Sequence, residues 1–378
     1  MAVSIIHKLP EGLAIALVLL AAVSCTREDY AVQDKELRGR MVNFSAVMSI
    51  DGTGTKGQIP TDNANLFTMG VFAGYEEEEE TFGPSSPAND FIDNVRYTRS
   101  FIENPFAGAD VCYWPFSGKL SFFAYAPYIS STFLQFASDY VSGYPRMSYS
   151  PTTNVTDQPD FCLATPVLDR HSSGEPIPLV FHHSLSQVVF SANYSGDMPP
   201  IVSASPLYVK VDNISICNVI GKKTVTMSSG TPCFDWQDDA ECPDGDRVSY
   251  LLDRSLNHQL NDIELPKATD PVSDNYMELT TVDGVANGVM YLLPQSMDYG
   301  EVYLEVTYGY YEMVDTKETL RASARTSCPL PAVDWEPTKT YRYKFTINLA
   351  ANSIVDPAVA VGTWKDINNT ESNPAHIE

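Results

Sequence analysis

The sequence predicts an all-β protein with two β-sandwich domains in tandem, and three observations support this fold class. The chain has 378 residues, which leaves room for two domains at roughly 150 residues each. Tyrosine (21), phenylalanine (17) and proline (26) are plentiful, whereas only 19% of the residues are charged. This composition is typical of aromatic strands separated by proline- and glycine-containing turns. No segment shows the apolar stripe of an amphipathic helix.

The charge balance excludes one class of partner. Acidic residues number 48 and basic residues 24, so the formal net charge is -24. A chain this acidic is repelled by nucleic acid and by anionic lipid, which disfavours DNA or RNA binding. The hydrophobic fraction of 44% is high enough for folded cores.

The N-terminus predicts export. Residues 13–24 form an apolar run that is shorter than the ~20 residues needed to cross a bilayer as a helix. The run fits the hydrophobic part of a secretory signal, and small residues precede Cys25. Cys25 therefore matches the acylated first residue of a mature bacterial lipoprotein, held on the membrane surface by its palmitate and other acyl chains. An ordinary secretory signal is the alternative.

The first predicted strand is residues 42–48, where apolar and polar side chains alternate. Its buried face would hold Val42, Phe44, Ala46 and Met48. The segment that follows is rich in glycine and predicts an exposed loop.

Further strands follow along the chain, separated by turn residues. The acidic run 76–80 predicts a solvated hairpin tip, because like charges repel one another in a packed arrangement. A domain boundary is expected near residues 174–178. The other predicted strands are residues 66–72, 95–98, 111–115, 120–128, 179–190, 207–216, 288–293, 301–308, 340–349 and 358–364.

Six cysteines lie beyond the signal, and an even number in an exported chain permits disulfides. Buried thiols and one or two bridges both remain open, and Cys233 with Cys242 is the first pair to test. The six are Cys112, Cys162, Cys217, Cys233, Cys242 and Cys328.

Catalytic chemistry finds little support in the sequence. His182 and His183 are neighbours in a predicted strand, so they face opposite sides and cannot jointly bind one metal. The motifs of zinc proteases, serine hydrolases and phosphate-binding loops do not occur. We therefore expect no enzyme activity, no cofactor and no metal.

Two further groups have alternative interpretations. Trp114, Tyr125 and Tyr128 could stack on sugar rings, although strand packing explains them better. An acidic loop lacks the spacing of a calcium-binding EF-hand, so we favour a solvated loop over a calcium site. Its members are Asp235, Asp238, Asp239, Glu241, Asp244 and Asp246.

The order of these features resembles the fimbrillin family, the type V pilins that Gram-negative gut and oral bacteria export as lipoproteins. The resemblance covers nearly the whole chain. It rests on Cys25, strand 42–48, Lys56, and then segments 69–73, 122–128, 181–186, 291–295, Trp335, 341–347 and Trp364.

The resemblance implies two transthyretin-like sandwiches and assembly by donor-strand exchange. A trypsin-like protease would cut between Lys56 and Gly57, although family members usually carry arginine there. The first strand would then leave, and a strand of another subunit would take its place. The implied divisions are a signal peptide (1–24), a tether and first strand forming a propeptide (25–56), an N-terminal sandwich (57–177) and a C-terminal sandwich (178–378).

The implied partners are other pilin subunits, the maturation protease, the outer membrane through the lipid, and a host or bacterial surface ligand. We expect a cell-surface fimbrium that supports adhesion and biofilm. The expected donor strand carries Ile354, Val355, Val359 and Val361.

Three alternatives stay open. The first strand would be a permanent edge strand, or the C-terminal strand would simply complete its own sandwich. The whole chain would be a cell-surface glycan-binding lipoprotein that does not polymerise.

Overall fold

The structure, a computed structural model, confirms the all-β class. It describes residues 41–49, 66–101, 104–108, 110–129, 132–136, 143–242, 246–256, 259–268, 275–282, 285–286 and 288–364. Within these ranges the only helical elements are two short 3-10 turns, η2 (Val155–Asp157) and η3 (Asp239–Glu241). The described residues contain no helix of the length and apolarity that a membrane crossing requires.

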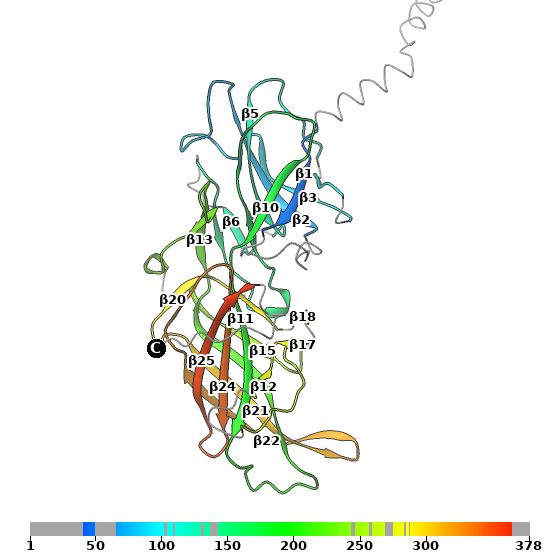
Figure 1. Cartoon of the computed structure of the whole chain (residues 1–378), viewed down its shortest axis with the longest axis vertical. Coiled ribbons are helices and arrows are strands. Elements are labelled where there is room, and N and C mark those ends of the chain that lie inside the picture. Colours follow the sequence, from blue (N-terminus) through cyan, green and yellow to red (C-terminus); the bar gives the residue numbers. More distant parts are fainter. Residues whose placement is uncertain are drawn as a thin grey trace, which may run out of the picture.

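The strands form two units that lie end to end (Figure 1). The first unit is built on a sheet that curls until its two edges meet. From one edge to the other this sheet contains β1 (Phe44–Met48), β10 (Ile177–His183), β8 (Cys162–Ala164), β5 (Lys119–Ala126), β2 (Thr68–Glu76), β3 (Ile92–Thr98) and β4 (Ala107–Gly108), and β9 (Val167–Arg170) pairs with β5.

A second sheet covers the outer face of this curled sheet. Both faces of β5 are consequently buried: Phe122 points into the curled sheet, whereas Phe123 packs towards the second sheet. The strands of the second sheet, in order, are β14 (Phe234–Trp236), β13 (Lys223–Met227), β7 (Arg146–Tyr149) and β6 (Leu134–Phe136).

The expected boundary between residues 177 and 178 does not coincide with the change of sheet. β10 belongs to the first unit, because Ile177, Leu179 and Phe181 enter its core. The chain then turns into the second unit but returns, since β13 and β14 pair with strands of the first. The first unit is therefore not a continuous stretch of sequence.

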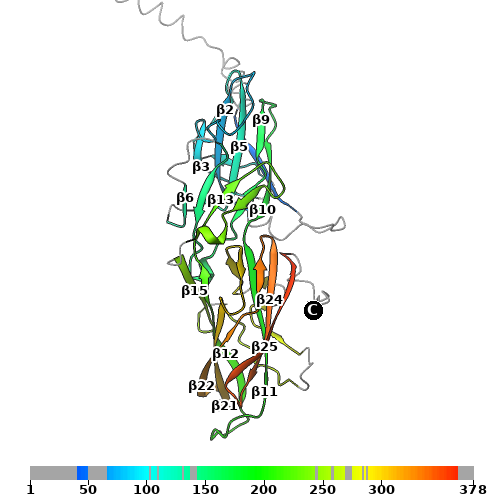
Figure 2. The same cartoon turned by 90° about the vertical axis from the view of Figure 1, so that its left-hand side faces the viewer.

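The second unit is a sandwich of two sheets, seen as two layers in Figure 2, with two small strand pairs beside them. One sheet contains β16 (Met277–Glu278), β11 (Ser186–Ser195), β24 (Lys339–Asn348) and β25 (Ser353–Thr363), with β19 (Met290–Leu292) paired to β11. The other contains β15 (Arg247–Asp253), β12 (Tyr208–Ile220), β21 (Tyr303–Val314) and β22 (Lys317–Pro329). Two small pairs are β17 (Thr281–Val282) with β18 (Val285–Ala286) and β20 (Gln295–Met297) with β23 (Val333–Trp335).

The strand predicted at residues 340–349 is confirmed as β24. Tyr341, Tyr343, Phe345 and Ile347 all enter the core between the two sheets. The strand sits in the middle of its sheet, parallel to β11 and antiparallel to β25. A period of two therefore identified a strand with one buried face.

One local prediction was wrong and another holds only in part. Residues 111–115 form no strand; Tyr113 only makes an isolated bridge to Met41. The solvated tip predicted for residues 76–80 is confirmed for residues 77–80, which are exposed, whereas Glu76 ends β2 with 2% of its surface exposed. Burial raises the pKa of Glu76, while Ser121 donates a hydrogen bond to its carboxylate at 3.4 Å.

Candidate functional site

The candidate site is the slot that β1 occupies in the first unit. β1 lies parallel to β10, with Phe44 opposite Ile177 and Met48 opposite Phe181. The backbone N–H groups of Ile177 and Ser49 donate to the carbonyls of Asn43 and Phe181, at 2.8 and 2.6 Å. One edge of β1 is thus fully paired.

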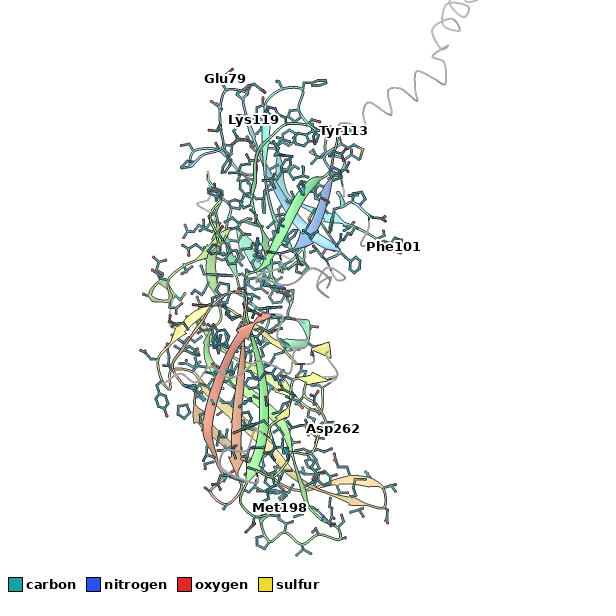
Figure 3. All side chains as sticks on the ribbon, viewed as in Figure 1. Glu79, Phe101, Tyr113, Lys119, Met198 and Asp262 are labelled. Atoms are coloured by element: carbon teal, nitrogen blue, oxygen red, sulfur yellow. The ribbon has the colours of Figure 1, made fainter. Side chains whose placement is uncertain are left out.

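The opposite edge of β1 meets the other end of the same sheet. The N–H of Phe106, next to β4, donates to the carbonyl of Phe44 at 2.9 Å. The N–H of Val42 donates to the carbonyl of Cys112, also at 2.9 Å. Tyr113, labelled in Figure 3, bridges to the residue before Val42. β1 is therefore the strand that closes the curled sheet.

The buried face of β1 is the one that the sequence predicted. The four side chains Val42, Phe44, Ala46 and Met48 are between 0% and 7% exposed. The Phe44 ring packs edge-to-face on Tyr97 and Phe122, with ring centroids 4.9 and 5.4 Å apart. Removing β1 would uncover this core along its whole length.

The outer face of β1 is different in character. Val47 is 51% exposed, and its register partner on β10, Val180, is 36% exposed. Only alternate side chains of β1 are buried in the core. A shift of one residue against β10 would turn these side chains to solvent, so the pairing register of β1 with β10 is fixed.

The expected cleavage and lipidation residues lie outside the described part of the chain. Cys25, Lys56 and Gly57 are not among the residues that the structure describes. Their roles stay predictions.

The candidate donor strand, β25, lies in the second unit. It pairs antiparallel with β24 from Lys339 opposite Thr363 to Asn348 opposite Ser353, and it forms the edge of its sheet. The exposure of the four expected contact residues is uneven. Ile354 is buried, Val355 and Val359 are half-buried, and Val361 is exposed.

The end of β25 contacts the first unit. Trp364 stacks on His183, with ring centroids 4.3 Å apart, and on Tyr291, with centroids 5.5 Å apart. His183 is thus packed where the two units meet. His182 faces the other way and bonds Thr165 at 2.9 Å.

The remaining sequence candidates are placed as structural residues. Trp114 and Tyr125 are buried in the first unit, and Tyr128 stacks on Tyr125. In the acidic loop, Asp239 accepts hydrogen bonds from Lys223 at 2.6 Å and from the N–H of Ser296 at 2.7 Å. The described side chains of this loop do not converge into a group of three metal ligands.

Cys233 and Cys242, the cysteine pair chosen from the sequence as the first to test, do not form a disulfide. The Cys233 thiol lies 3.9 Å from the carbonyl of Leu163, and the Cys242 thiol lies 3.8 Å from that of Asp238. The six cysteines of the described residues are all thiols.

Sequence reasoning missed one constellation. Asp160, Cys162 and His183 bring three potential ligand atoms within 4.8 Å of one another. Cys162 and His183 are opposite each other on neighbouring strands. Only the strand register reveals this, because 20 residues of chain separate the two.

The model of the fimbrillin-like family matches residues 61–364, so the chain belongs to that family. The family places the chain in the class of fimbrial-type adhesion subunits. This match begins after β1 and ends at Trp364. No curated protein matches the chain.

The chain is similar to solved structures over most of its length, and the first of these shares the fold. A fimbrial protein from Bacteroides vulgatus has a TM-score of 0.58 at 15% identity, over 86% of this chain and 100% of the other. A candidate cell adhesion protein from Bacteroides ovatus has a TM-score of 0.47 at 12% identity, over 86% and 98%. One from Bacteroides uniformis has a TM-score of 0.45 at 15% identity, over 86% and 98%.

Proposed function

We propose that this chain is a pilus subunit that polymerises by proteolysis-triggered donor-strand exchange. The observation that carries the proposal is the position of β1, which closes the curled sheet. The only covalent link from β1 to the rest of the unit is the chain segment 50–65. A single cut after Lys56 would leave β1 held by non-covalent contacts alone.

Loss of β1 would leave a slot that is destabilised in two ways. The backbone N–H and C=O groups of β10 would lose their hydrogen bonds to β1, and an unpaired buried backbone group raises the free energy of the fold. The core residues Tyr97 and Phe122 lose their contact with Phe44. An incoming strand with alternating apolar side chains satisfies both.

β25 is the proposed donor. In the structure it completes the second sandwich, so donation requires it to separate from β24. Two features favour this role: β25 is an edge strand with a single strand partner in its sheet, and it carries small and β-branched side chains that suit a narrow slot. Insertion into the next subunit is head-to-tail and does not close a ring, which produces a filament.

The remaining parts of the proposal concern the cell. Export as a lipoprotein through Cys25 would bring the precursor to the outer membrane, with the lipid lost when the propeptide is cut. The filament would then support adhesion and biofilm through a surface ligand.

Low-dose trypsin on the purified chain tests the proposal. We expect cleavage between Lys56 and Gly57, followed by ladders on gels and filaments in electron micrographs. The Lys56→Gln chain is the matched control and should stay monomeric. Cleavage without any polymer would contradict strand exchange, and glycan-array binding by that monomer would favour the glycan-binding alternative.

A further inference from the structure

The far end of the curled sheet holds three metal-ligating side chains that the assembly mechanism does not use. Cys162 begins β8 and His183 ends β10, and the two are direct antiparallel partners. Asp160 lies two residues before Cys162, so it is on the same face of the extended chain. The pleat therefore presents an oxygen, a sulfur and a nitrogen to one point.

The distances suit a small cation. Nδ1 of His183 lies 2.7 Å from Oδ2 of Asp160 and 3.8 Å from Sγ of Cys162. Ligands of a tetrahedral zinc ion lie about 2.0–2.3 Å from the metal, which puts neighbouring ligand atoms roughly 3.3–3.8 Å apart. All three ligand atoms lie within 4.8 Å of one another, so zinc binding would require the Asp160 oxygen to move away from Nδ1 of His183.

The arrangement is not that of a catalytic cysteine. In a cysteine–histidine–aspartate relay the thiol and the carboxylate use opposite ring nitrogens, whereas here both face Nδ1 of His183. Cys162 is 4% exposed, so a substrate has little access to its thiol.

Unpaired polar atoms lie beside this cluster. Within the described residues, Oδ1 of Asp160 and the hydroxyl of Tyr149 are buried without a hydrogen-bond partner. Tyr149 is 0% exposed, and both Asp160 and Cys162 are among its charged or polar neighbours. Buried polar groups nearly always have a hydrogen-bond partner. Two unpaired polar atoms next to one cluster of potential metal ligands therefore require an explanation.

We propose that Asp160, Cys162 and His183 form a binding site for Zn²⁺. Thiolate with imidazole selects zinc over magnesium or calcium, and a water would complete the tetrahedron. Cys162 would bind as the thiolate and release its proton to solvent. The Asp160 side chain is 26% exposed and so provides access from solvent.

The site also bears on the junction between the units. The His183 ring that would bind the ion stacks on Trp364 at the end of β25. A metal bond fixes the orientation of its histidine ligand. Zinc would therefore hold the surface on which the end of β25 packs.

Cobalt spectroscopy on the full chain carrying Cys25→Ser tests the site. We expect one equivalent of Co²⁺ to give a thiolate charge-transfer band and the visible bands of tetrahedral cobalt, and one equivalent of Zn²⁺ to abolish both. Cys162→Ser should lose the charge-transfer band. Cys328→Ser is the matched control, since Cys328 is a buried thiol in the core of the second unit.

Thermal melting supplies a second readout. Zn²⁺ should raise the melting temperature of the Cys25→Ser chain and of the Cys328→Ser control, and it should leave that of Cys162→Ser unchanged. A Cys25→Ser chain that shows no thiolate band overturns the proposal without reference to any variant. A band that persists in Cys162→Ser overturns it as well, and a site that holds only water gives neither signal.

Discussion

At the scale of single residues, the site depends on one aromatic side chain. Phe44 is fully buried and contacts two other rings, whereas Val47 on the same strand is 51% exposed. Substitutions at these two positions therefore compare how much the buried face and the exposed face of β1 contribute to stability.

Phe44→Ala should lower the free energy of unfolding by about 3–5 kcal/mol, because it removes a large buried side chain and leaves a cavity. Urea denaturation measures the change. Val47→Ala is the control and should change stability by less than about 0.5 kcal/mol. Equal effects of the two substitutions would mean that β1 is not anchored through its inner face.

A buried carboxylate in the second unit predicts a pH effect. Glu312 is 0% exposed; its carboxylate accepts the N–H of Ala204 at 2.6 Å and that of Ser205 at 3.2 Å, and it pairs with Arg321. Burial alone would raise its pKa, but these donors outweigh burial, so the pKa of Glu312 is lowered below its ordinary 4.5. The resulting stabilisation is present above that ordinary value and is lost as the pH falls through the lowered one.

The Glu312→Gln chain should accordingly be less stable than the unaltered chain at neutral pH, with a difference that shrinks below about pH 4.5. Denaturant unfolding across a pH series measures this. Glu79→Gln changes an exposed carboxylate at the far end of the molecule (Figure 3) and should match the unaltered chain throughout. A Glu312→Gln difference that grew on acidification would contradict the assignment.

At the scale of elements, donor-strand exchange requires that β1 can leave. β1 and β10 run parallel, and Val47 lies opposite Val180 on the solvent-exposed side. Two cysteines at this pair would have the short Cα separation that a disulfide needs. The pair therefore offers a reversible lock on the strand.

The Val47→Cys, Val180→Cys chain should be cut by trypsin under oxidising conditions without polymerising. Adding a reductant should restore polymer formation, because the strand is then free to leave. The single Val47→Cys chain controls for the substitution itself. Polymerisation by the oxidised, locked chain, with the disulfide verified by mass, would show that β1 stays in place during assembly.

Several elements were predictable from the sequence, and the reason is local. Residues 42–48 and 340–349 each have one buried and one polar face, which produces a period of two. β13 was not assigned to the first unit, because its pairing with β7 spans more than 70 residues and leaves no local pattern; β14 joins that unit through β13. The Asp160–Cys162–His183 group was missed for the same reason.

At the scale of the whole molecule, Trp364 connects the end of β25 to the first unit. It is 9% exposed and is stacked on His183 and Tyr291. Its packing holds the end of β25 where the two units meet.

Trp364→Ala should reduce stability by about 3 kcal/mol and make β25 more susceptible to limited proteolysis, because a buried aromatic contact is lost. Trp364→Phe keeps a stacking ring, so its stability should lie between that of the unaltered chain and that of the Trp364→Ala chain. If the alanine chain resists proteolysis like the unaltered chain, the end of β25 is held by β24 alone.

The most direct measurement of the central claim is the fate of β1 in the polymer. Filaments formed after cleavage at Lys56 are pelleted, washed under native conditions and analysed by quantitative mass spectrometry. Strand exchange predicts that peptides from residues 41–49 are found in the supernatant, with subunits in the pellet beginning at Gly57. Filaments that retain those peptides in equal number with the subunits would contradict the account.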